Sequence, residues 1–235
     1  MIISVFLITM SAPLEWDKLE NLIRESRIEK STALAKIRDF EPLLGTYFIK
    51  NSGRTVPRSR WCFPVSGYTG ESIGGINGSG YRPTGYDFFD GNENKGHPGH
   101  DIFVNDKNQD CIDDNTGNPV DIFSVSSGIV VAARTGWKPG SKIRGGNYIW
   151  IYDTATNGYF GYAHLDSVFV KSGDIVAPCQ RIATLGRTGL HAYKKRSPTH
   201  LHICYLKSVD GYPKPEDIYM DLLRTSHKMR RLMKK

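Results

Sequence analysis

The sequence predicts a mainly β protein, in which an antiparallel sandwich or barrel-like core carries helices at its N-terminal end and one helix at its C-terminal end. The chain of 235 residues contains 24 glycines, 12 tyrosines and 10 phenylalanines, a mix that favours turns and strands. Short apolar runs separated by turn residues fill the middle of the chain. At both ends, apolar residues instead recur near a 3.6-residue period, which is typical of helices.

Four segments are expected along the chain. Residues 1–12 contain the apolar run IISVFLITM, which resembles the core of a secretion signal, although no basic residues precede it; the alternative is the first turn of a helix. Residues 13–48 are expected to form a helical segment, residues 49–213 the main domain, and residues 214–235 a helix with a basic tail. No stretch of the sequence is long enough to span a bilayer.

Seven runs predict the strands of the main domain, in chain order: residues 61–65, 128–133, 147–152, 159–164, parts of 168–176, 180–185 and 200–206. Asn157-Gly158 is a strong hairpin signal between two of them. The glycine-rich residues 66–96 indicate long loops on a rigid support. Helix is expected again from Pro215, because proline suits the first helical position.

The chain is basic, with a formal net charge of +7 and a sequence pI of about 9.2. Such a charge suits polyanions, but no nucleic-acid-binding motif accompanies it, so no nucleic-acid partner is expected. Four cysteines show no CxxC spacing, which argues against a cysteine-ligated zinc. Their even number permits disulfides, and Cys204 is expected to be a buried free thiol.

Five side chains of metal-site type fall in three short clusters: His97 and Asp101 in HPGHD, His164 in GYAHL, and His200 and His202 in THLHI. Imidazole and carboxylate groups are zinc ligands, and a catalytic zinc uses three of them and keeps one position open. In a strand, His200 and His202 would point to one face, with their Cα atoms roughly 6.6 Å apart. Spacing alone does not say which of these two histidines binds a metal.

His97 and Asp101 would lie about 13 Å apart in an extended chain, so they need a bend to share an ion. Pro98-Gly99 is expected to supply it, because proline fixes φ and glycine accepts unusual dihedral angles. His100 would then point away from its neighbours, which assigns it a structural role. A lone HxxxD or a lone histidine carries little information, so the hypothesis depends on the three clusters together.

Residues 61–203 resemble the lysostaphin/LytM-type zinc endopeptidases, which cut the cross-links of bacterial peptidoglycan. The resemblance rests on HxxxD, YAHL and HxH, and on motifs between them: a GxVxxA strand at 128–133, a VxxGDxV-like turn at 168–176 and LGRTG at 185–189. The same order of motifs along the chain makes the resemblance specific.

The resemblance implies that His97, Asp101 and His202 bind one Zn²⁺ per chain. It implies that His164 and His200 are catalytic residues beside the metal, which position or deprotonate water and stabilise the oxyanion or the leaving amine. The protein would be a monomeric peptidoglycan cross-link endopeptidase of the periplasm, cell envelope or exterior of a bacterium.

The alternative is a catalytically silent or latent LytM-like module that regulates separate cell-wall hydrolases. Silent relatives usually lack several of the five residues, all of which are present here. In a latent enzyme, the helices at 14–44 or a residue such as Asn77 would cover the groove and supply a fourth zinc ligand. The loop at 66–96 would form one groove wall, with Tyr81, Tyr86 and Phe88 as candidate contacts.

Some segments differ from the compact core of the family that the chain resembles. Residues 106–114 begin as D-x-N-x-D, like a calcium loop, but Cys111 and Gly117 stand where such loops have Gly and Glu. A solvated acidic turn is therefore expected, with a Ca²⁺ site as the alternative. Two basic loops, 137–144 and 194–196, are candidates to contact anionic glycan or envelope polymers.

Overall fold

The computed structural model describes residues 2–91, 93 and 95–233, and of residues 2–10 and 228–233 it describes the backbone alone. The described α-helices are α1 (Ile2–Arg24), α2 (Lys30–Lys50) and α3 (Tyr219–Met233). The strands are β1 (Gly99–Phe103), β2 (Asp121–Phe123), β3 (Gly128–Arg134), β4 (Asn147–Asp153), β5 (Gly158–Val168), β6 (Ile175–Val176), β7 (Arg181–Leu185), β8 (His200–Val209) and β9 (Tyr212–Pro215). The predicted mainly β protein with helices at both ends is confirmed.

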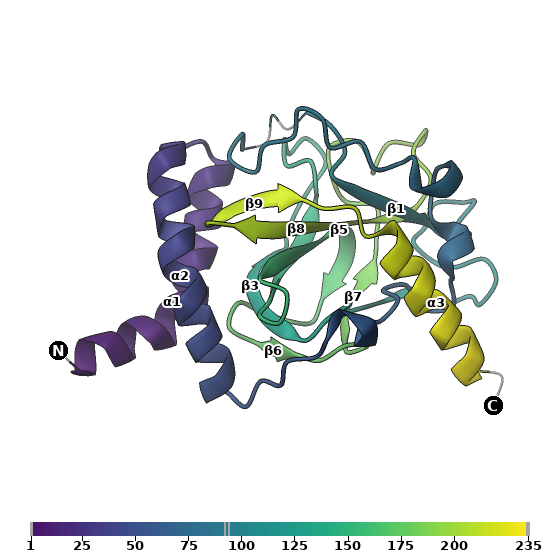
Figure 1. Ribbon diagram of the computed structural model, residues 1–235. Helices are drawn as coiled ribbons and strands as arrows, with labels where there is room; N and C mark the ends of the chain where they lie inside the picture. The colour runs from purple at the N-terminus through teal and green to yellow at the C-terminus, as the bar shows by residue number, and fades with distance from the viewer. Residues whose placement is uncertain (1, 92, 94, 234–235) are drawn as a thin grey trace.

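The strands belong to one antiparallel sheet with the order β1-β8-β5-β4-β3-β6 along its longest path. β9 pairs with β8, and β2 joins the sheet through β7, which pairs with β5. Figure 1 shows α1 and α2 side by side at one end of the sheet and α3 at the other. The hairpin predicted at Asn157-Gly158 does join β4 to β5, and Asn157 has a φ of 52°.

Two hydrophobic cores lie on the two faces of the sheet, because side chains alternate along each strand. In β4, Ile149 and Ile151 enter one core, whereas Tyr148, Trp150 and Tyr152 enter the other. The first core is closed by the segment that precedes β1 and by residues at the start of α3. The second core is closed by α1 and α2.

The helical segment predicted for residues 13–48 is a hairpin of α1 and α2. Trp16 of α1 stacks on Tyr159 of β5 with 5.2 Å between ring centroids, and Phe48 of α2 is buried. Each such side chain stabilises the packing by about 1.5–3 kcal/mol. The hairpin is therefore part of the fold and not a loose extension.

The apolar run IISVFLITM is the first part of α1, which begins at Ile2. Most of its side chains lie outside the described part of the chain, so its role as a secretion signal stays a prediction. Among the described residues, no helix is both long and apolar enough to cross a membrane. The basic tail also lies largely outside the described side chains, apart from His227, which is exposed.

One buried carboxylate fastens α1 to the sheet. Glu20 is 1% exposed and accepts hydrogen bonds from the guanidinium of Arg24, at 2.6 and 2.8 Å, and from the hydroxyl of Tyr148, at 3.0 Å. Arg134 of β3 donates to Glu20 at 3.2 Å and to Asp17 at 2.6 Å. The network satisfies each charge, which a buried ionic group requires.

Replacing Glu20 with alanine is expected to lower the free energy of unfolding by about 3–5 kcal/mol, because two largely buried guanidinium groups lose their shared partner. Urea denaturation followed by circular dichroism measures the change. The matched control is Glu15→Ala, which breaks an exposed pair with Lys18 and should cost less than about 1 kcal/mol. Equal stability of the two variants would show that α1 is held by apolar packing alone.

Two of the predicted strands differ from the structure. Residues 61–65 are not a strand: only Val65 forms a bridge, to Ile122, and the segment is tied down by the disulfide Cys62–Cys179. Within 168–176, strand is confined to the end of β5 and to β6. Cys204 is a buried free thiol, as predicted.

The C-terminal helix begins four residues later than predicted. Pro215 is the last residue of the edge strand β9, where its missing N–H costs no ladder hydrogen bond. The helix starts after Asp217, whose carboxylate accepts the backbone N–H of Tyr219 at 2.8 Å. The start of α3 is therefore marked by Asp217 and not by Pro215.

Candidate metal centre and active site

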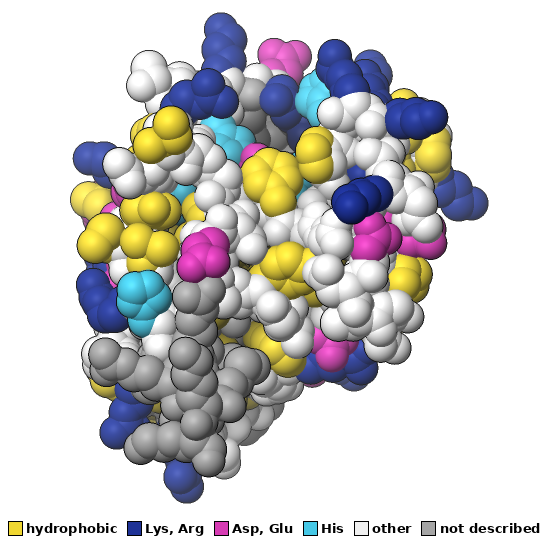
Figure 2. All heavy atoms as spheres, turned by 90° about the vertical axis from the view of Figure 1, so that its right-hand side faces the viewer, with side chains coloured by type: hydrophobic (Ala, Val, Ile, Leu, Met, Phe, Trp, Pro, Cys, Tyr) yellow, Lys and Arg dark blue, Asp and Glu magenta, His cyan; other side chains and the backbone are white. Residues whose placement is uncertain are grey.

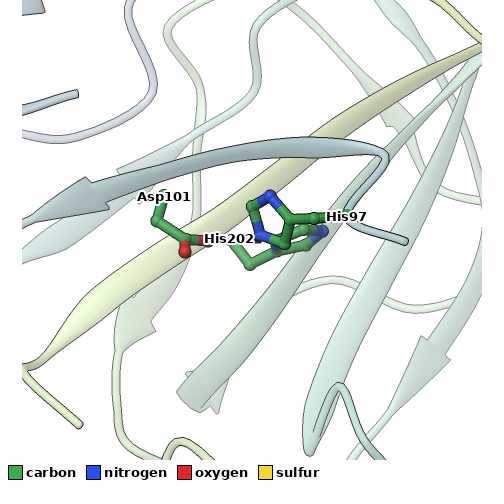
Figure 3. A group of neighbouring side chains, drawn as sticks. All are labelled: His97, Asp101 and His202. Atoms are coloured by element: carbon green, nitrogen blue, oxygen red, sulfur yellow. Dashed lines mark hydrogen bonds and ion pairs between the residues drawn. The ribbon is translucent and has the colours of Figure 1, made fainter. Parts of the chain in front are cut away.

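The pairing of β1 with β8 places Asp101 directly opposite His202. Side chains directly opposite one another in an antiparallel pair are close neighbours. His97 precedes β1 and is fixed by two backbone hydrogen bonds to Arg82, of 2.6 and 2.8 Å. As a result, all three side chains point toward one another from two neighbouring strands and the segment before β1 (Figure 3).

Three potential ligand atoms meet at this point. His97 Nε2 lies 3.1 Å from Asp101 Oδ1, and His202 Nδ1 lies 3.0 Å from both of these atoms. A metal ion could be held by three or more His, Cys, Asp or Glu side chains that lie close together. Among the described residues, His97, Asp101 and His202 form such a group. Ligands of a tetrahedral zinc lie roughly 3.3 Å apart, so the observed separations fit such an ion with little adjustment.

Hydrogen-bond partners favour a cation at this position. His97 Nδ1 lies 2.7 Å from the carbonyl oxygen of Gly80 and donates its proton there, which leaves a lone pair on Nε2 of the neutral ring. That lone pair faces the carboxylate oxygen of Asp101, which is also an acceptor. Either a second proton on His97 or a metal ion must therefore lie between the two.

The pKa shifts agree with this picture. Burial opposes the ionisation of Asp101, but hydrogen bonds from His202 and His97 outweigh it and hold its pKa far below the usual range. Burial also acts to lower the pKa of His97, but the carboxylate of Asp101 raises it overall. Burial lowers the pKa of His202 in spite of the same carboxylate. A metal ion would replace the proton on His97.

The predicted bend between His97 and Asp101 has a different basis from that expected. Gly99 is not in the left-handed region; it is the first residue of β1, opposite Cys204. A Cβ at Gly99 would overlap the backbone of Ile203, so glycine is needed here for the close approach of β1 to β8.

His164 is brought to the same face by a β-bulge. It has a φ of 67°, and the register of β5 with β4 shifts on either side of it, from Ala163↔Tyr148 to Leu165↔Asn147. Regular alternation would place His164 with Tyr162, in the first core. The bulge re-aims its imidazole toward the other face, at a backbone cost of about 1–3 kcal/mol.

His164 and His200 are held by matching hydrogen bonds. His164 Nδ1 donates to the carbonyl of Thr188 at 2.8 Å, and His200 Nδ1 donates to the carbonyl of Pro198 at 2.7 Å. The two rings lie 4.9 Å apart, and His200 Nε2 is 3.8 Å from Asp101 Oδ1. Burial, together with the neighbouring His200 and His202, lowers the pKa of His164 to about 3.

Comparison with known proteins identifies this arrangement. Residues 96–212 match the model of peptidase family M23. The chain carries a peptidase family M23 domain. The predicted resemblance to lysostaphin/LytM-type peptidases is therefore confirmed, and the matched range contains HxxxD, YAHL and HxH.

Solved structures similar to the chain include a zinc containing peptidase from Vibrio cholerae, with 25% identity over 69% of this chain and 40% of that chain and a TM-score of 0.43. Lysostaphin from Staphylococcus simulans is 27% identical over 56% of this chain and 44% of that chain, with a TM-score of 0.38. Its catalytic domain is 26% identical over 61% of this chain and 88% of that chain, with a TM-score of 0.40. The chain spans less than half of the first two proteins. None of the curated proteins compared matches it.

A cavity of 370 Å³ opens beside the histidines of the M23 domain. All five predicted site residues line it. Helix α1 contributes Glu20, Ile23 and Arg24 to its wall, within the helical segment expected to cover the groove in a latent enzyme. The amphipathic period of α1 predicts that one face is buried, but not which part of the domain it meets.

The glycine-rich loop meets the cavity as predicted, through Tyr86 and Phe88. Tyr81 instead stacks on His100, with 5.8 Å between centroids. His100 is fully buried, points away from the metal centre and lies 2.9 Å from a carboxylate oxygen of Asp217, in accord with its structural assignment. Asn77 is exposed and lies outside the cavity lining.

The carboxylates of the 106–114 loop bind backbone amides. Asp106 accepts from the N–H groups of Asp110 and Cys111, both at 3.1 Å, and from the hydroxyl of Thr199 at 2.6 Å. Asp114 accepts from the backbone N–H of Lys107 at 3.0 Å. Hydrogen bonds thus organise the loop, and no three acids among its described residues lie close enough together to share a cation.

Proposed function

We propose that the protein is a zinc-dependent endopeptidase that hydrolyses peptide cross-links of bacterial peptidoglycan. In this proposal His97, Asp101 and His202 hold one Zn²⁺, and His164 and His200 are the catalytic residues. The observation that carries the proposal is the meeting of two imidazole nitrogens and one carboxylate oxygen within 3.0–3.1 Å, inside an M23 domain. Three protein ligands leave one position for water or substrate, as in catalytic zinc sites.

Zinc in this site supplies Lewis acidity, which polarises the scissile carbonyl group and makes a water molecule more acidic. His164 is neutral at pH 7, so its Nε2 has a lone pair that can accept the proton of the attacking water. Its Nδ1–H bond to Thr188 fixes the tautomer and the direction of the ring. His200 is fixed in the same way by Pro198. Once its Nε2 has taken up a proton, the Nε2–H group can donate to the oxyanion or to the leaving amine.

The surroundings of the site support this role. Helix α1 of the helical segment predicted as residues 13–48 contributes to one wall of the cavity of the predicted catalytic domain at 49–213, and α2 packs with it on the same core. The disulfide Cys62–Cys179 suits an oxidising compartment, so we place the protein in the periplasm, the envelope or outside the cell. Its substrate is peptidoglycan, and we expect a monomer.

The regulatory alternative, a silent or latent module, has weaker support. All five residues are present and line one cavity, whereas a silent binding module needs none of them. A latent enzyme would need a fourth ligand, expected from the helices at 14–44 or from a residue such as Asn77. Asn77 lies outside the cavity lining, and Glu20, the α1 carboxylate that does line the cavity, is already paired with Arg24 and Arg134.

The full chain, purified and loaded with zinc, is expected to release muropeptides of lower cross-linking from intact sacculi. Mass spectrometry of the soluble fraction identifies the bond that is cut. Chelation should stop the release and an equimolar amount of zinc should restore it, because the ligands remain in place without the ion. Protein that carries one zinc per chain yet releases nothing from any sacculus would contradict the proposed activity.

A further inference from the structure

Two basic loops that are distant in sequence form one surface beside the cavity. The loop at 137–144 and the loop at 190–196 are joined by a backbone hydrogen bond from Leu190 to Ile143, of 3.2 Å. Trp137 also packs on Tyr193 with 5.4 Å between ring centroids. We call this surface the basic wall and define it by six side chains: Lys138, Lys142, Arg144, Lys194, Lys195 and Arg196.

Side-chain hydrogen bonds hold the backbone of one of the two loops of the basic wall, the loop at 190–196. The guanidinium of Arg187 donates to the carbonyls of Lys194 and Ser197 at 3.1 and 2.8 Å, and to the hydroxyl of Thr199 at 3.0 Å. The side chain of Gln109 donates to the carbonyl of Lys195 at 3.0 Å. These bonds fix the backbone of the loop, so its cationic side chains are presented at a defined place.

The charges of the basic wall are not neutralised within the described part of the chain. None of its six cations has a described carboxylate within 4.0 Å, whereas Arg24, which lines the cavity, and Arg134 are both paired with Glu20. Figure 2 shows Lys and Arg side chains along the upper part of one face of the molecule. The cavity lining therefore holds one guanidinium that is paired, Arg24, and one without a described carboxylate partner, Arg144, beside further unpaired cations of the basic wall.

The basic wall reaches the cavity itself through Arg144 and His191, which line it and are exposed. The positive charges of Arg144, Lys194 and Arg196 act on His191, and together with burial they lower its pKa. This shift favours the neutral imidazole, which can donate and accept hydrogen bonds. A guanidinium beside a neutral imidazole is well suited to bind a carboxylate by charge-assisted hydrogen bonds.

We propose that Arg144, Lys194 and Arg196 form a carboxylate-binding subsite, so that the preferred substrate carries a free carboxylate close to the peptide bond that is cut. The inference rests on the proposed function and specifies its substrate class: cross-linked peptides with free carboxylates are preferred over the same peptides with amidated carboxylates. The subsite acts mainly on substrate binding and not on the chemical step, because none of its three side chains is among those proposed to hold zinc or to move a proton.

The test compares two forms of one substrate. Cross-linked muropeptide dimers are released from sacculi by a muramidase, and half of the sample is amidated with carbodiimide and ammonia. For the zinc-loaded wild type, we expect KM to be about tenfold lower for the free carboxylates, with similar kcat. Raising the salt concentration should weaken this preference, because exposed charges are screened.

The variant Arg144→Gln/Lys194→Gln/Arg196→Gln should process both forms with the high KM of the amidated substrate. Its matched control, Lys36→Gln/Lys171→Gln/Lys214→Gln, removes the same charge from exposed positions outside the basic wall and should keep the preference. Equal KM values for both forms in the wild type, or an unchanged preference in the first variant, would overturn the subsite.

Binding separates this inference from the proposed function. Calorimetric titration of the metal-depleted full chain with the two dimer preparations should show the same preference for free carboxylates, lost in the first variant only. If no dimer is cut by any zinc-loaded sample, the proposed function fails, and the titration still decides whether the subsite exists. Equal binding of both preparations to the wild type would refute the subsite even in an active enzyme.

Discussion

Replacement of His202 by alanine is expected to remove stoichiometric zinc and to reduce hydrolysis of peptidoglycan by at least about a thousandfold. His202 supplies one of three ligand atoms, and its Nδ1 lies 3.0 Å from each of the other two. Without it, Asp101 and His97 offer only two ligands, which bind zinc weakly. Metal content is measured by mass spectrometry of the purified protein, and activity by muropeptide release.

The matched control is His227→Ala, which removes an exposed histidine from α3 and should keep both zinc and activity. Thermal unfolding with and without added zinc gives a second measurement. Zinc should raise the unfolding temperature of the wild type and of the control but not of His202→Ala, because a ligand stabilises only the state that binds it. One zinc per chain in His202→Ala would contradict the assignment of this residue as a ligand.

Replacement of His164 by asparagine should separate metal binding from turnover: zinc stays bound, whereas kcat falls by about 10²–10⁴-fold. Asparagine is chosen because it accepts the positive φ of this bulged position, and its amide N–H can still donate to the carbonyl of Thr188. What it lacks is the basic Nε2 atom. Retained zinc with lost turnover would therefore show that His164 takes part in proton transfer.

The comparison between His164→Asn and His164→Ala separates structural from catalytic effects. Alanine loses the hydrogen bond to Thr188 and tolerates a φ of 67° poorly, so His164→Ala should be less stable than His164→Asn by about 1 kcal/mol or more. Both should lack activity to a similar extent. If His164→Asn keeps more than a tenth of the wild-type kcat with zinc bound, another residue takes part in proton transfer. His200 would then be the first candidate.

Much of the site could be predicted from local rules. The period-2 alternation of strands places His200 and His202 on one face, whatever the rest of the fold does. To bring the HxxxD pair to the same place, β1 must pair with β8, which sets Asp101 opposite His202. Sequence patterns do not state strand register, so only the resemblance to a family linked these two clusters before the structure was known.

Other features followed no local rule. The bulge at His164 reverses the face that alternation predicts for it, and its positive φ is imposed by contacts with the segments around Gly145 and Thr188. The contribution of α1 to the cavity and the union of the two basic loops depend on packing between segments about 50 to 130 residues apart. Pro215 shows the same limit, since a proline fits both a helix start and an edge strand.

The amino-acid sequence by itself determined the mainly β class, most of the strands, the hairpin at Asn157-Gly158 and the five residues of the site, because periodicity, turn chemistry and ligand type are properties of short segments. The tertiary structure decided which atoms of those residues meet, which nitrogen of each histidine is free, and what surrounds them. These depend on strand register and on which surfaces pack together, and both arise from the free energy of the whole chain and not from that of any one segment.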